Sequence, residues 1–167
     1  MKALDPVDVY RVRAVEGWLG LGLRAEAAAE LEAIPPDHQG HPDVLEARWL
    51  FHVHARQWDA ALAVARKLIF AAPDRASGWL HQAYALRRAA DGGLAQAREV
   101  LMPAAEKFPK EPIIPFNLAC YACQLGQLDE ARKWLKRAMK VGGREAIRHM
   151  ALTDEDLKPL WPELAES

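Results

Sequence analysis

The sequence predicts an all-α protein built from repeated helix pairs. Ala, Leu, Arg and Glu dominate the 167 residues while β-branched residues are sparse, a composition that favours helix over strand. No stretch alternates apolar and polar residues as a half-buried strand would. A single helical pattern also returns about every 34 residues along the chain, which is typical of a repeat protein.

The repeat is clearest in a column of small residues. Ala27, Ala61, Ala97 and Ala131 lie 34, 36 and 34 residues apart. Positions four and seven residues further on share one stripe of a helix with them, so the columns predict helices with a common buried face. The residues in these further columns are Leu31, Ala65, Leu101 and Leu135, and then Ile34, Leu68, Ala104 and Ala138.

These helices belong to the segments 21–34, 55–68, 92–104 and 125–138, and each follows a partner helix. We expect the partners at about 7–20, 43–55, 76–90 and 113–125. Their starts carry capping side chains or an N-terminal proline at Asp5-Pro6, His41-Pro42-Asp43 and Asp74. Each repeat is therefore a helix, a turn, a second helix and a loop.

Prolines mark where the second helices end or bend. Pro73 and Pro109 follow the second and third of them and prevent their continuation. Pro103 lies inside the third and has no N–H to donate to the carbonyl of Glu99. We expect a kink at that point.

A unit of this length, with a small residue early in its second helix and a closing proline, resembles the tetratricopeptide repeat. The last unit carries the resemblance best, in Asn117-Leu118-Ala119 and in the run Leu125-Gly126-Gln127-Leu128-Asp129-Glu130-Ala131. The resemblance covers about residues 8–145. It implies a right-handed α-α superhelix of about four hairpins within one domain, 1–167, with repeats at about 8–41, 42–75, 76–111 and 112–145.

The last part of the chain, 146–167, is expected to cap the array. Thr153-Asp154-Glu155-Asp156 reads as an N-cap with an acidic first turn, and Leu157, Leu160 and Trp161 follow it. This stretch resembles the terminal segment of bacterial end-of-group tetratricopeptide modules. We predict that it forms a capping helix with Trp161 largely buried, and the alternative is that the tail is itself a docking motif.

Chemistry-bearing motifs are weak. Cys120 and Cys123 form a CxxC in the middle of a helix, with no preceding strand and no second pair to complete a zinc site. His52 and His54 point to different faces of a helix, and His38 and His41 fall in a loop. No hydrolase, metalloprotease or phosphate-loop motif occurs. The sequence predicts no enzyme, no catalytic residue, no metal and no cofactor.

The bulk charge argues against an anionic partner. Lys plus Arg (22) nearly cancels Asp plus Glu (23), so no global field attracts nucleic acid or a membrane surface. The start of the chain lacks a secretory apolar core, and two cysteines imply no disulfide framework. The prediction is a cytoplasmic protein that binds neither nucleic acid nor membrane.

The resemblance implies that the first helix of each pair lines a concave groove where a protein or peptide partner binds. The function predicted is therefore an adaptor or scaffold, and the alternative is a structural, self-assembling homo-oligomer. Only Asn117 matches the polar set with which chaperone-binding members hold a C-terminal carboxylate, so that function is not predicted. The residues expected to face the groove are Leu80, Tyr84, Arg87, Arg88, Phe116, Asn117, Cys120, Cys123 and Gln124, with Glu46, Leu50, Val53 and His54 from the second pair.

Overall fold

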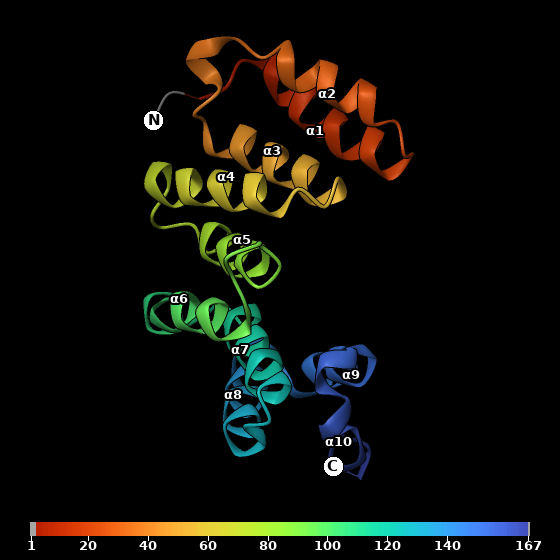
Figure 1. Ribbon diagram of the computed structural model, residues 1–167, viewed down its shortest axis with the longest axis vertical. Coiled ribbons are helices and arrows are strands. Elements are labelled where there is room, and N and C mark those ends of the chain that lie inside the picture. The colour runs from red at the N-terminus through yellow and green to blue at the C-terminus, as the bar shows by residue number, and fades with distance from the viewer. Residues whose placement is uncertain (1–2, 167) are drawn as a thin grey trace. The chain divides into compact units, whose positions relative to one another are not determined.

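The computed structural model describes residues 3–166, and over this range the protein is all-α with no β-strand. Figure 1 shows successive helices joined by short turns. The α-helices are α1 (Pro6–Gly20), α2 (Arg24–Glu32), α3 (Pro42–His54), α4 (Trp58–Ala71), α5 (Ala76–Leu86), α6 (Leu94–Lys107), α7 (Ile113–Gln124), α8 (Leu128–Gly142), α9 (Arg144–Thr153) and α10 (Trp161–Glu166), with 3-10 helices η1 (Pro36–His38) and η2 (Glu155–Leu160).

The observed helices follow the predicted order closely. The first helix of every pair begins within a residue of its expected start, and only α5 ends clearly early, at Leu86. Helix α6 continues through Pro103 to Lys107. The predicted kink at Pro103 stays a prediction.

The three columns form the core, as predicted. Ala27, Ala61, Ala97 and Ala131 are completely buried, and every residue of the other two columns is at most 4% exposed. On the partner helices α1 and α7, Val15 and Ala119 occupy the equivalent facing position and are also completely buried. Small side chains on both sides let the two helix backbones approach closely. Ala83 of α5 is completely buried too, but the neighbour on which α5 packs is α4.

The turns inside the first, second and fourth pairs use left-handed backbone. Gly22 and Gly126 have φ of 75° and 76°, and Arg56 takes the same turn position with φ 54°. A non-glycine residue is uncommon in this region because its Cβ crowds the backbone. The second repeat therefore holds an arginine where the first and last hold glycine.

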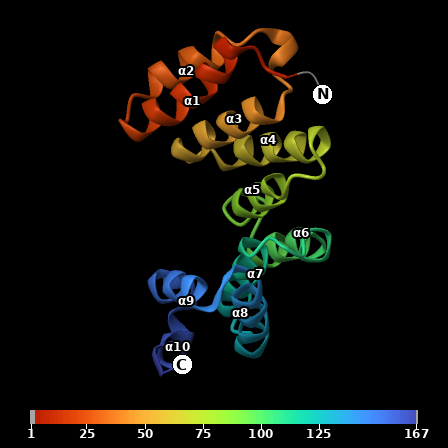
Figure 2. The same ribbon diagram turned by 180° about the vertical axis from the view of Figure 1, so that it is seen from behind.

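By its internal packing the chain divides into two compact units. The N-terminal unit ends at Asp91 and the C-terminal unit begins at Gly92. In the N-terminal unit α1 packs on α2 and α3, and α4 packs on α3 and α5. Figure 2 shows from behind that α1 and α2 lie side by side, as do α3 and α4.

In the C-terminal unit α7 packs on α6 and α8, and the remaining segment folds back on this hairpin. Helix α9 packs on α8, and η2 packs on α7. Leu157, Leu160 and Leu164 are buried. Trp161 is only half-buried, less than predicted, and its indole N–H donates to the carbonyl of Ala151 at 2.8 Å. Within residues 3–166 no helix is long and apolar enough to cross a membrane.

Candidate binding groove

A groove of about 450 Å³ opens in the N-terminal unit, lined by α1, α3 and α5. From α1 come Val12, Arg13 and Glu16, and from α3 come Glu46 and Leu50. Spacings of three and four residues place these side chains on one face of each helix. The result is an apolar floor flanked by charges of both signs.

An aromatic stack forms part of the groove wall. The rings of Trp49 and His81 are parallel within 7°, with centroids 3.7 Å apart. Burial lowers the pKa of His81 to about 4, so the imidazole is neutral at pH 7. The indole N–H of Trp49 is buried and has no hydrogen-bond partner. An unpaired buried donor costs free energy, so the stack with His81 is made at some expense to stability.

Next to the stack lies a cluster of Tyr84, Arg88 and Trp58. The Arg88 guanidinium lies 3.8 Å from the centroid of the Tyr84 ring and 5.5 Å from that of Trp58. Arg88 also donates to the Tyr84 carbonyl at 2.9 Å. Tyr84 remains 36% exposed and contacts Trp49 edge to face, with centroids 5.8 Å apart. Tyrosine, tryptophan and arginine are the residues most enriched at binding hot spots.

Only some of the residues predicted to face the groove in this unit lie in it or next to it. Glu46 and Leu50 line the groove, and Tyr84 and Arg88 form the adjoining cluster. Leu80 and Arg87 are half-buried, and His54 is exposed outside the lining. The groove residues of α1 and His81 were not among those named from the sequence. The repeat frame could have found Val12, because it lies 34 residues before Glu46.

In the C-terminal unit the predicted groove residues lie on α7, and the C-terminal segment of the chain packs on this helix. Phe116, Cys120 and Cys123 are 5%, 2% and 4% exposed on α7, and η2 packs on this helix. Burial raises the pKa of the Cys123 thiol, so the thiol stays protonated. Asn117 is half-buried and donates to the Ile113 carbonyl at 3.0 Å.

Polar contacts hold the covering segment in place. The Sγ of Cys120 lies 3.7 Å from a carboxylate oxygen of Asp154, and Gln124 donates to the Asp156 carbonyl at 3.2 Å. Arg132 donates to both carboxylate oxygens of Glu163, at 2.8 and 2.6 Å. This pairing lowers the pKa of Glu163. The inner face of α7 is thus occupied by residues of the same chain.

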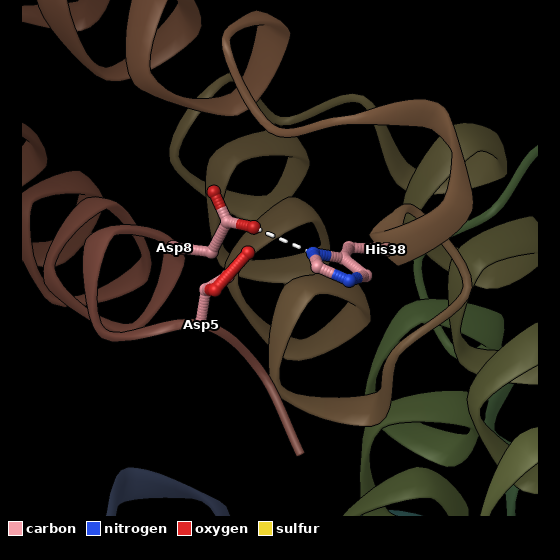
Figure 3. A group of neighbouring side chains, drawn as sticks. All are labelled: Asp5, Asp8 and His38. Atoms are coloured by element: carbon pink, nitrogen blue, oxygen red, sulfur yellow. Dashed lines mark hydrogen bonds and ion pairs between the residues drawn. The ribbon is translucent and has the colours of Figure 1, made fainter. Parts of the chain in front are cut away.

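Two groups of side chains have the composition of metal ligands. Figure 3 shows Asp5, Asp8 and His38, whose ligand atoms all lie within 4.8 Å of one another. Asp8 is only 2% exposed, and one of its carboxylate oxygens lies 2.6 Å from Nδ1 of His38. Arg11 is also 3.7 Å from the other oxygen. This pairing accounts for the buried carboxylate and ties α1 to the loop before α3.

The second group comprises Cys120, Asp154 and Asp156. Asp154 caps η2 by accepting from the Asp156 backbone N–H at 2.9 Å, while its other oxygen faces Cys120. Both groups therefore have a role in packing. Sequence reasoning did not find either, because the partners lie about 30 residues apart.

A solved structure shares this architecture across nearly the whole chain. It is the crystal structure of a thermophilic TPR protein of Thermus thermophilus, similar with a TM-score of 0.69 and 19% identity over 96% of this chain and 100% of that one. No protein-family model and no curated protein matches the sequence. The fold is a tetratricopeptide-like array of helix pairs, as the sequence predicted.

Proposed function

We propose that the chain is a protein- or peptide-binding scaffold and that the groove lined by α1, α3 and α5 is its binding surface. The tetratricopeptide-like fold supports a role in protein interaction generally. The observation that carries the proposal is the groove itself, in which an apolar floor adjoins Tyr84, Arg88 and Trp58. Concave sites of this kind, with a few polar groups, suit recognition of an extended segment.

The charged groups at the groove support binding over catalysis. Asp43 accepts from Arg75 at 2.5 Å, and Glu46 accepts from the Ser77 hydroxyl at 2.7 Å. His81 is held neutral in its stack on Trp49. These groups are committed to neighbours, so they shape a surface and are poor candidates for proton transfer.

We also propose a cytoplasmic location, which the free thiols of Cys120 and Cys123 support. The two thiols lie on one helix and are buried together. A reducing compartment would keep them in this state.

Site-specific photo-crosslinking tests the groove. A photoreactive residue at position 50 should capture a partner from the cell of origin, whereas the same residue at exposed Glu26 on α2 should not. The captured partner is then purified and its affinity for the chain is measured.

Exchanging charges at the groove with Arg13→Glu/Glu16→Lys should weaken this binding about tenfold, while the exposed exchange Glu99→Lys/Lys110→Glu should leave it unchanged. Equal capture at positions 50 and 26 would contradict the proposal.

Self-assembly is a second candidate, supported by a different surface. Val7 and Tyr10 of α1 are 60% and 71% exposed, and Leu21, just after the end of α1, is 71% exposed on the same side. Light scattering on a sizing column tests this idea. A dimer that persists through a roughly hundredfold dilution and is lost in Val7→Glu/Tyr10→Glu would support self-assembly. A wild-type monomer throughout would exclude it.

A further inference from the structure

A second groove lies on the N-terminal unit and shares no lining residue with the first. It measures about 880 Å³ and is formed by α3, α4 and the turn at Gln39 and Gly40. On α3 its side chains are Leu45, Arg48 and His52, which occupy a different face from Glu46 and Leu50. The two grooves therefore present separate surfaces.

The lining of this second groove combines an apolar floor with an exposed aromatic side chain. Leu45 and Val64 form the floor, and Phe70 is 92% exposed beside it. Covering an aromatic side chain of this size removes on the order of 150–250 Å² from water. An aromatic residue left almost fully exposed at the edge of an apolar groove is a feature of interaction sites.

Every charged side chain that lines the groove is basic. Arg66 and Lys67 are exposed on α4, and Arg48 comes from α3. Arg48 donates to the Gln39 side chain and to the Leu31 carbonyl, which are neutral acceptors, so its charge is not cancelled by them. The whole chain carries a formal charge of only −1, and this positive potential is therefore local.

We propose that this second groove docks an acidic peptide segment of a partner protein, which packs an apolar side chain against Phe70 and sets its carboxylates against Arg48, Arg66 and Lys67. The charge complementarity selects carboxylates, and the apolar floor with Phe70 selects a peptide over a nucleic acid. A nucleic-acid site would need a broader basic surface to follow the phosphates.

The C-terminal segment of this chain is already held by a combination of an acidic–basic pair and buried apolar side chains. In the C-terminal unit, Glu163 pairs with Arg132 while Leu160 and Leu164 are buried next to it. That segment carries Asp154, Glu155, Asp156, Glu163 and Glu166 against a single cation, Lys158. Its sequence is a suitable probe for the second groove.

The test measures binding of a fluorescein-labelled peptide that copies residues 154–166 to the full-length chain by fluorescence anisotropy. We expect saturable binding that weakens with added salt. Charge reversal with Arg66→Glu/Lys67→Glu should weaken it about tenfold or more, and Phe70→Ala should weaken it severalfold. The exposed pair Lys110→Glu/Lys140→Glu carries the same charge change elsewhere and should leave the affinity unchanged.

Three results would overturn the proposal. The first is the absence of saturable peptide binding. The second is loss of binding on Arg132→Glu but not on Phe70→Ala. This result would show that the peptide displaces residues 154–166 of the chain from their own site and does not bind the second groove. The third is equal competition by a short single-stranded oligonucleotide with no effect of Phe70→Ala, which would indicate a general anion site. Phe70 is exposed, so circular dichroism should show every variant at this position folded.

Discussion

At the scale of single residues, the buried alanines decide how closely neighbouring helices pack. Ala97 and Ala131 have no exposed surface, and Ala119, which faces Ala131 from α7, has none either. A larger side chain at these positions must push two backbones apart, because a close-packed interior has no spare volume.

We predict that Ala97→Leu and Ala131→Leu each lower the free energy of unfolding by roughly 1–3 kcal/mol, since overpacking separates the helices. Denaturant titration measures the change. Ala95→Leu is the matched control, because Ala95 is exposed on the same helix as Ala97. Unchanged midpoints for both buried variants would show that the small column is not a close contact.

His81 should make stability depend on pH. Its pKa is lowered to about 4 in the folded protein against 6.5 for the free side chain, so the unfolded chain binds more protons between these values. This contribution is constant above about pH 7 and decreases as the pH falls from 6.5 toward 4. We expect a loss of about 2 kcal/mol in the free energy of unfolding between about pH 7 and pH 5.

The variant His81→Phe provides the comparison for that prediction. It keeps an aromatic ring against Trp49 but has no group that titrates in this range. Chemical denaturation of both proteins across the pH series should show the decrease in the wild type only. Parallel pH profiles for the two proteins would mean that His81 is protonated without cost.

At the scale of elements, the C-terminal segment acts as a cover for α7. Leu157 is completely buried, η2 packs on α7, and the Sγ of Cys120 contacts Asp154 just before η2, with Cys123 buried on the same helix. The accessibility of these thiols therefore reports whether the cover is in place.

We predict that Leu157→Ala destabilises the protein by about 2–5 kcal/mol and speeds the reaction of both cysteines with a thiol reagent. The lost packing releases the segment, and local opening then exposes the thiols. Lys158→Ala is the control, because this neighbouring side chain is exposed. Labelling rates that stay at the wild-type value in Leu157→Ala would contradict the covering role.

At the scale of the whole molecule, the chain is organised as two units that meet in sequence at Asp91 and Gly92. Within the N-terminal unit each helix has a packing partner, and α5 packs on α4. The boundary falls inside the third predicted repeat, between its two helices. The prediction of a single domain at 1–167 with four repeats stays a prediction.

We predict that a fragment of residues 1–91 folds by itself, with a helical circular dichroism spectrum and a cooperative thermal transition. A fragment of residues 1–74 is the matched comparison. It lacks α5, leaves the apolar surface of α4 uncovered and should unfold at a lower temperature. A 1–91 fragment without a cooperative transition would show that the boundary does not separate independent folding units.

The sequence alone determined the order of the helices, the turns between them and the buried columns. Ala27, Leu68 and Leu135 are core residues because i, i+4 and i+7 spacing is a local property that survives in any packing of the helices. The exposure of a given apolar side chain is different, since it depends on distant segments. Phe116 is 5% exposed and Phe70 is 92% exposed, and neither outcome is visible in the local pattern.

Tertiary structure alone decided which faces remain available to a partner. The groove needed α1, α3 and α5 together, and its Trp49–His81 stack joins residues from two repeats. The covering of α7 needed contacts such as that of Cys120 with Asp154, 34 residues away. The physical reason is that burial and charge pairing are set by three-dimensional neighbours, whereas helix formation is set by neighbours in the sequence.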